Sequence, residues 1–259
     1  MIEAFGRTDV GRRRKLNEDS FLVAPESHLY AVCDGMGGHN AGEVASRIAV
    51  ETLASFVEKS VAEKDITWPW GLDADLSFEA NRLKTAIRLA NSQVYQSADS
   101  DEELTGMGTT VVAAIVSGNT VSIGSAGDSR CYLVRDGQLQ QLTQDDSWVS
   151  AALGEGILNS DDVERHPLRN VITKAVGARD SIDLDIVEQT LQEGDVALLC
   201  SDGLHGMVSD DEIARLLIPG SDPLPYSLEE AATHLVDAAN EGGGKDNDTV
   251  ILRRSSDKG

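Results

Sequence analysis

Four short strand-like runs follow one another in the middle of the chain, and the turns between them constrain the fold more than any other feature. The runs are rich in β-branched and apolar residues and cover residues 109–116, 120–124, 131–135 and 139–142. Ser117-Gly118-Asn119 separates the first two runs and Asp136-Gly137 the last two, and turns of this composition are typical of β-hairpins. Because hairpins join antiparallel neighbours, we predict antiparallel sheets.

Three other segments carry apolar residues at helical spacing and are predicted to be amphipathic helices. They cover residues 41–59, 83–94 and 228–239. Further strand-like runs lie at residues 20–23, 29–33, 196–201 and 250–252. This order, with two helices together between groups of strands, is not the regular alternation of strand and helix that builds a parallel sheet. We therefore predict a single α+β domain with helices on the outside of antiparallel sheets.

The chain has 259 residues and a formal net charge of −22, and this acidity excludes some partners. Nucleic acids and anionic membrane surfaces require clustered Lys and Arg, so neither is expected to bind. No apolar run approaches the roughly 20 residues that cross a bilayer, and we expect a soluble, cytoplasmic protein without membrane insertion. Cys33, Cys131 and Cys200 lie far apart in apolar runs, and we predict buried free thiols and no zinc site.

Two apolar runs end at an Asp-Gly pair, one at Asp34-Gly35 and the other at Asp202-Gly203. A third acidic residue, Asp246, immediately precedes the last apolar run. Carboxylates that are held at strand ends and converge on one place form a site for hard divalent cations, which prefer oxygen ligands. The alternative interpretation is that each Asp-Gly pair only turns the chain after a strand.

Charged residues also gather near the N-terminus and at the end of a later strand. Arg14, Glu18 and Asp19 lie close together before a strand-like run, and Asp128 interrupts an apolar run. An Arg side chain suits a phosphate, and the acids suit metal-bound water. The alternative for the N-terminal group is a solvated, mixed-charge edge of a sheet. The Gly-rich turn at residues 36–43 lets a ligand approach the backbone, but it lacks the sequence of a nucleotide-binding loop.

Taken together and in order, these motifs resemble those of the bacterial PP2C-type (PPM) serine/threonine protein phosphatases. The motifs are Arg14-x-x-Asn17-Glu18-Asp19, Asp34-Gly35-Met36-Gly37-Gly38-His39, Gly108-Thr109-Thr110, Gly127-Asp128-Ser129-Arg130, Cys200-Ser201-Asp202-Gly203-Leu204 and Asp246-Asn247-x-Thr249. The resemblance implies a four-layer α-β-β-α sandwich, in which two antiparallel sheets are flanked by helices. It also implies one PP2C-like phosphatase domain over residues 1–259, with a flap subdomain at about 145–170, a polar segment long enough to suggest a function.

The resemblance further implies metal-dependent hydrolysis of phosphoserine and phosphothreonine in proteins, by direct attack of a hydroxide that bridges two Mn²⁺ or Mg²⁺ ions. In this family Asp34 bridges the two metals, and the Gly35 backbone carbonyl reaches one of them. The other assignments that the resemblance implies are Asp202 and Asp246 as metal ligands, Asp128 with Asp202 at a possible third metal site, Glu18 and Asp19 as ligands through water, and Arg14 as the phosphate-binding residue. No cysteine lies in a phosphate-binding loop, which disfavours a cysteine-dependent phosphatase.

Two positions depart from the family pattern. Met36 stands where animal members have a His that is considered the general acid, and Asp146 stands where the family usually has a His. The proton donor is therefore open between a metal-bound water, which we favour, and His39. The expected partners are phosphorylated proteins, as substrates of a serine/threonine kinase, and the expected state is a monomer. The alternatives are a catalytically inactive signalling module that binds phosphoproteins, and a phosphatase of small phosphoesters.

Overall fold

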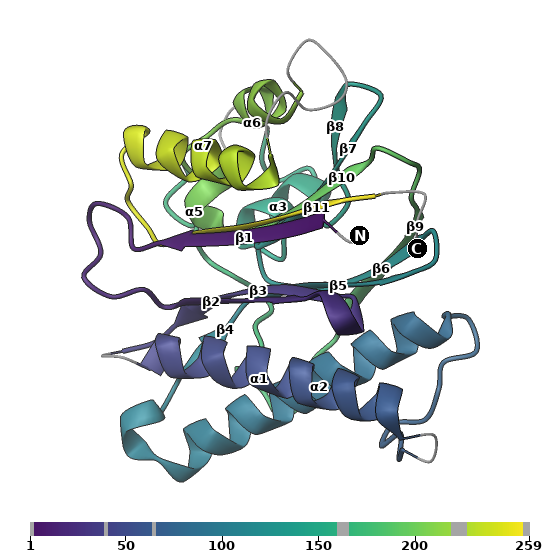
Figure 1. The fold of residues 1–259 in the computed structure, drawn as a ribbon. Coiled ribbons are helices and arrows are strands. Elements are labelled where there is room, and N and C mark those ends of the chain that lie inside the picture. Colours follow the sequence, from purple (N-terminus) through teal and green to yellow (C-terminus); the bar gives the residue numbers. More distant parts are fainter. Residues whose placement is uncertain (1–2, 39–40, 64–65, 160–165, 219–226, 256–259) are drawn as a thin grey trace.

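Two antiparallel β-sheets face each other, and helices cover the outer side of each sheet (Figure 1). The computed structural model describes residues 3–38, 41–63, 66–159, 166–218 and 227–255. The four layers are those of the α+β sandwich predicted from the sequence, and all strand pairs are antiparallel, as the hairpin turns indicated.

The first sheet has the strand order β1-β11-β10-β7-β8. Its strands are β1 (Glu3–Asp9), β11 (Asp248–Arg254), β10 (Val196–Cys200), β7 (Arg130–Arg135) and β8 (Gln138–Gln141). The first and last strands of the chain are neighbours, in a register that runs from Glu3 opposite Arg254 to Asp9 opposite Asp248. The helices beside this sheet are α5 (Asp202–His205), α6 (Asp210–Leu217) and α7 (Leu228–Glu241).

The second sheet has the order β2-β3-β5-β6-β9, and the short strand β4 pairs with β3. Its strands are β2 (Asp19–Ala24), β3 (Leu29–Met36), β4 (Gly108–Thr109), β5 (Val111–Ser117), β6 (Thr120–Ala126) and β9 (Asp185–Thr190). Two long helices, α1 (Ala41–Ala62) and α2 (Phe78–Ser100), lie across its outer face (Figure 1). The short helices η1 (Pro25–Ser27), η2 (Glu102–Leu104) and α3 (Trp148–Gly154) lie in connections.

The continuous apolar runs of the central strands are explained by burial on both faces. In β3, Leu29, Ala31 and Cys33 pack toward the two long helices, whereas Tyr30 and Val32 pack between the sheets. Successive side chains of a strand point to opposite faces, so a strand with two covered faces needs apolar residues at every position. The runs therefore lack the alternation of a half-exposed strand.

Most predicted elements are present, and the structure differs from the predictions in three respects. The strand predicted to end at Cys33 continues to Met36, because Gly35 pairs with Thr109 and Met36 with Gly108 in β4. The helices α3, α5 and α6 were not predicted, since each has eight residues or fewer and too few turns to show a periodic pattern. The helices α1 and α2 are also longer than predicted, since α1 continues to Ala62 and α2 runs from Phe78 to Ser100, beyond the residues whose apolar repeat indicated a helix.

Some of the predicted features lie in residues that the structure does not describe. His39 and residues 160–165 of the expected flap lie outside the described residues. The described start of that segment contains α3 and is joined to its end by a bridge between Ser147 and Ile172. None of the described helices combines the length and the apolar content needed to cross a membrane. All three cysteines are free and buried, as predicted.

Candidate functional site

The two Asp-Gly pairs are not turns, and the glycines have a different role. Gly35 lies inside β3 and Gly203 lies in the first turn of α5. Neither of these two glycines has a positive φ. A Cβ atom on Gly35 would overlap the backbone oxygens of Gly42 and Glu18, and a Cβ on Gly203 would overlap the backbone oxygen of Asn247. The turn interpretation is therefore wrong: each glycine lets two backbone segments touch directly behind an aspartate.

These close contacts bring carboxylates from both sheets to one end of the sandwich. Asp34 and Asp19 are opposite each other on β3 and β2, while Asp202 begins α5 directly after β10. Asp128 lies in the turn between β6 and β7, and Asp246 immediately precedes the segment that enters β11. The aspartates that the sequence predicted to converge thus do come together, from five different places in the chain.

Electrostatics place Asp34 at the centre of this group. Burial raises the pKa of Asp34 well above its ordinary value, and the neighbouring carboxylates raise it further. Those carboxylates are Asp19, Asp202, Asp128 and Asp246. Burial also raises the pKa of Asp202, and the nearby charge of Asp246 raises it further. In the described part of the chain, no group of three or more Asp, Glu, His or Cys side chains is placed so that it could already hold a metal ion.

Asp19 connects the two sheets beneath this group. Its Oδ2 accepts hydrogen bonds from Thr249 Oγ1 at 2.6 Å and from Ser201 Oγ at 2.8 Å, both on the opposite sheet. Its side chain is only 8% exposed, and burial raises its pKa to about 7. Ser201 and Thr249 were part of the sequence motifs, but no role was predicted for them. A signal for this role was present, since Ser201 directly precedes Asp202 and Thr249 follows Asp246 by three residues, and a hydroxyl is a suitable partner for a buried carboxylate.

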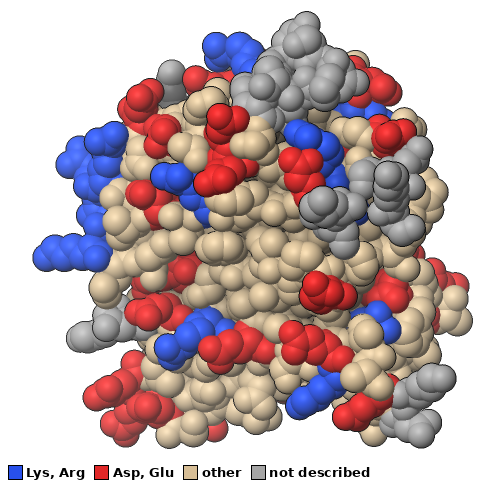
Figure 2. Space-filling view, in the orientation of Figure 1, with Lys and Arg blue, Asp and Glu red and all other residues tan. Residues whose placement is uncertain are grey.

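Arg14 reaches the same group from the loop between β1 and β2. Its Nη2 lies 2.7 Å from Asp246 Oδ2, and its Nη1 lies 4.0 Å from Glu18 Oε2. The hydrogen bond to Asp246 raises the pKa of the Arg14 guanidinium, so the side chain is a permanent cation. Figure 2 shows Lys and Arg side chains gathered at the left edge of the molecule, where Figure 1 places this loop.

Asn247 holds that loop in place. Its Nδ2 donates to the carbonyls of Val10 and Leu16, at 3.0 and 2.9 Å, and its Oδ1 accepts from the Glu18 amide at 2.8 Å. One buried amide side chain therefore fixes both ends of the loop that carries Arg14, and it does so from the residue next to Asp246. The N-terminal charged group is not the solvated sheet edge of the alternative interpretation, because Asp19 is buried and the loop is anchored to the site.

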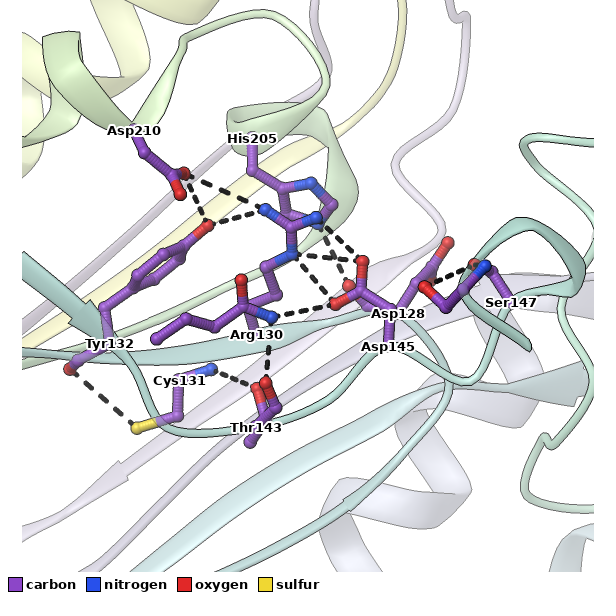
Figure 3. A network of polar contacts seen from close by, with 11 residues as sticks. Asp128, Arg130, Cys131, Tyr132, Thr143, Asp145, Ser147, His205 and Asp210 are labelled. Atoms are coloured by element: carbon purple, nitrogen blue, oxygen red, sulfur yellow. Dashed lines mark hydrogen bonds and ion pairs between the residues drawn. The ribbon is translucent and has the colours of Figure 1, made fainter. Parts of the chain in front are cut away.

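A network of polar contacts supports Asp128 (Figure 3). His205 Nε2 lies 3.0 Å from the Asp128 backbone oxygen, and because a carbonyl only accepts, Nε2 carries the proton. Burial lowers the pKa of His205 to about 4, so the ring is neutral. Nearby, Arg130 donates two hydrogen bonds to the Asp145 carboxylate, from Nε at 2.9 Å and from Nη2 at 2.7 Å. Burial raises the pKa of Asp128 itself to about 7.

The neighbouring Asp146, at the position where the family usually has a His, contacts both the turn at Gly127 and the segment at residues 173–174. Its Oδ1 lies 2.8 Å from Lys174 Nζ, and its Oδ2 accepts from the Gly127 amide at 3.2 Å. Its backbone oxygen accepts from the Thr173 amide at 2.7 Å. Asp145 and Asp146 therefore join both ends of the 145–173 segment to the turn that carries Asp128.

An open groove of about 1050 Å³ leads from the carboxylate group along this segment. Its walls include Asp128, Asp202 and Asp246 at one end, and Arg169 and Lys245 are also among its lining residues. A groove of this volume is at the upper end of the range of ligand-binding clefts.

Comparison with known proteins agrees with this geometry. Residues 11–238 match the family model described as Protein phosphatase 2C. The serine/threonine phosphatase Stp of Listeria welshimeri is 38% identical over 253 residues, which cover 95% of this chain and 93% of that protein. The serine/threonine protein phosphatase PstP of Mycobacterium tuberculosis is 38% identical over 95% of this chain and 43% of that protein.

Solved structures give the same result. The crystal structure of the Mycobacterium tuberculosis phosphatase PstP/Ppp superposes with a TM-score of 0.83 at 36% identity, covering 98% of this chain and 99% of that one. The catalytic domain of PstP in complex with two manganese ions superposes with a TM-score of 0.82 at 34% identity, covering 99% of each chain. The chain therefore belongs to the bacterial PP2C-type (PPM) family of metal-dependent serine/threonine protein phosphatases.

Proposed function

We propose that this enzyme hydrolyses phosphoserine and phosphothreonine in proteins that a serine/threonine kinase has phosphorylated. The observation that carries the proposal is the group of carboxylates around Asp34, with Arg14 beside Asp246 and an open groove lined by Asp128, Asp202 and Asp246. We treat residues 1–259 as one catalytic domain, with the segment at residues 145–170 as its flap. The three buried free thiols fit a reducing compartment such as the cytoplasm.

The residues present fit two divalent cations, Mn²⁺ or Mg²⁺, with a possible third. Five buried carboxylate oxygens have no hydrogen-bond partner among the described residues, and three of them, Glu18 Oε1, Asp19 Oδ1 and Asp202 Oδ1, belong to this group, whereas the other two are on Asp248. An unpartnered buried oxygen is costly unless a cation binds there. In the proposal, the ligands are Asp34, the Gly35 carbonyl, Asp202 and Asp246, with Asp128 for a third ion and Glu18 and Asp19 acting through water. Bound cations of this kind lower the pKa of water and stabilise charge on phosphoryl oxygens.

The protein's own residues supply binding and orientation. Arg14, whose side chain is 48% exposed, exchanges its contact with Asp246 for the oxygens of the substrate phosphate. A covalent mechanism through cysteine is disfavoured, because burial raises the pKa of Cys33, Cys131 and Cys200 and keeps the thiols protonated. His205 is neutral and donates to a backbone carbonyl, so it is a poor proton donor, and we assign that role to water in the groove.

Hydrolysis of a phosphothreonine peptide tests the proposal. Phosphate release is measured in EDTA, after addition of Mn²⁺, and with Asp202→Asn as the inactive control. We expect release only with Mn²⁺ and only in the wild type. Peptide binding without turnover would favour the inactive phosphoprotein-binding module, and turnover of p-nitrophenyl phosphate but of no phosphopeptide would favour a phosphatase of small phosphoesters.

A further inference from the structure

Four consecutive cationic residues, Arg12–Lys15, form one exposed loop on a chain whose net charge is −22. We call this segment the basic loop. It lies at the left edge in Figure 2, at the end of the sandwich where the aspartates converge. Within an acidic protein, a concentrated positive patch beside the active site requires an explanation beyond solubility.

The basic loop is fixed to the site and does not extend freely into solvent. Two of its amides donate to the Gly244 carbonyl, at 2.8 and 3.1 Å. Gly11, just before it, has a φ of +77°, and a Cβ there would overlap the Asp246 backbone oxygen. The position of the four charges relative to Asp246 is therefore set by backbone contacts, so a ligand that they bind is oriented toward the aspartates.

Only one of the four charges is paired with an acid. Arg14 contacts Asp246 and Glu18, whereas Arg13 and Lys15 form no salt bridge with any residue that the structure describes. Arg13 and Lys15 flank the proposed phosphate-binding residue on both sides. An extended peptide advances about 3.3 Å per residue, so side chains one to three positions from a phosphoresidue held at Arg14 come within reach of both cations.

We propose that the basic loop selects phosphopeptides with acidic residues, or further phosphates, next to the phosphoserine or phosphothreonine. The inference rests on the function proposed above and names the substrate class of the same site. A broad anionic surface such as a membrane or a nucleic acid is a poorer partner, because it also meets the acidic remainder of the chain. A short peptide contacts only the loop and the groove.

Three phosphothreonine peptides of equal length test this preference, with Glu, Gln or Lys at the two positions on each side. Binding is measured by fluorescence anisotropy in EDTA, where no turnover occurs, and kcat/KM is measured with Mn²⁺. We expect about a fivefold advantage of the Glu peptide over the Gln peptide, which is the effect of two exposed ion pairs, and its loss in 0.5 M salt. The advantage is expected in KM rather than in kcat.

Substitution then assigns the preference to the loop. Arg13→Gln/Lys15→Gln is expected to bring the Glu and Gln peptides to equal values, and Arg13→Glu/Lys15→Glu to reverse their order. Arg215→Gln is the matched control, because Arg215 is an exposed cation on α6 with a side chain that is 75% exposed. This variant is expected to keep the wild-type ratio.

Equal binding of the three peptides by the wild type would overturn the inference, as would an unchanged ratio in the Arg13→Gln/Lys15→Gln variant. Binding to anionic lipid vesicles without any ranking among the peptides would overturn it in favour of a membrane surface. If the peptides are ranked in binding but none is hydrolysed with Mn²⁺, the substrate preference stands and the proposed catalytic function fails.

Discussion

Replacing Asp128 by Asn in the metal-free protein measures how much the burial of this carboxylate, together with its charged neighbours, costs the fold. Burial, followed by the nearby charges of Asp202 and Asp145, raises the pKa of Asp128 to about 7. In the unfolded chain the same carboxyl titrates near its ordinary value of about 3.9. Between these two values the folded state binds more protons than the unfolded state, so stability falls as the pH rises and stops falling above the folded-state pKa. Asp128→Asn removes this contribution.

The size of the effect follows from the shift. A rise of about 3 pKa units corresponds to about 4 kcal/mol of unfolding free energy, and about two thirds of it is lost between pH 5 and pH 8. The stability of Asp128→Asn relative to the wild type is therefore expected to increase by about 3 kcal/mol over this range. For a domain of this size, 1 kcal/mol changes Tm by about 2–4 °C, so the gap in Tm widens by roughly 5–10 °C.

The comparison of two proteins isolates Asp128 from other titrating groups. His205, whose pKa is lowered to about 4, acts in the opposite direction and makes the fold more stable as the pH rises to about 6.5. This contribution is present in both proteins and cancels in their difference. The raised pKa of Asp19, like that of Asp128, lowers stability as the pH rises. This contribution also cancels in the difference, as long as the substitution at Asp128 leaves the pKa of Asp19 unchanged.

Thermal unfolding in EDTA, followed by differential scanning fluorimetry from pH 5 to pH 8, measures the gap. Adding Mn²⁺ at about 100 times its Kd is expected to stabilise the wild type by about 2.7 kcal/mol, and more at pH 8 than at pH 5, because the ligands are then ionised. A gap between Asp128→Asn and wild type that stays constant, or that narrows as the pH rises, would refute the reasoning.

Three further predictions concern other parts of the site. Arg14→Ala is expected to raise KM for a phosphopeptide about tenfold or more, through loss of a charge-assisted contact, and steady-state kinetics with unchanged KM and kcat would remove Arg14 from the site. Gly203→Ala forces a Cβ against the Asn247 backbone oxygen and is expected to lower stability by about 3 kcal/mol, measured by urea unfolding. Arg130→Met leaves Asp145 without its partner; a loss of about 2 kcal/mol and weaker Mn²⁺ binding in isothermal titration calorimetry are expected, and unchanged values would contradict a supporting role for this pair.

The parts of the fold that the sequence predicted well are those set by local chemistry. The Asp136-Gly137 turn joins β7 to β8, and Asp136 indeed has a positive φ of 50°. Helices α1, α2 and α7 are long enough for their apolar residues to repeat over several turns. In these cases neighbouring residues determine the conformation, and no knowledge of distant contacts is required.

The functions of the glycines could not be predicted in the same way. Asp-Gly favours a turn when only neighbours in sequence are considered, and that interpretation was weighed for both pairs. Gly35 and Gly203 are instead required because the backbone of Glu18 approaches Gly35, and that of Asn247 approaches Gly203, from other strands or loops of the chain. Contacts between segments so far apart in sequence leave no local pattern. The convergence of the aspartates was predicted only through the resemblance to a family, and the supporting roles of Ser201 and Thr249 emerged from the structure.

The two sheets remain packed together at the end where the aspartates converge, although the aspartates repel one another. Asp34 comes from one sheet, and Asp202 and Asp246 come from the other, so repulsion among them acts to separate the sheets at that end. The apolar layer between the sheets and the hydrogen bonds that Asp19 accepts from the opposite sheet act against this separation. In the proposed function, cations held between the carboxylates would reverse the sign of this interaction, because each sheet would then be attracted to a shared positive charge.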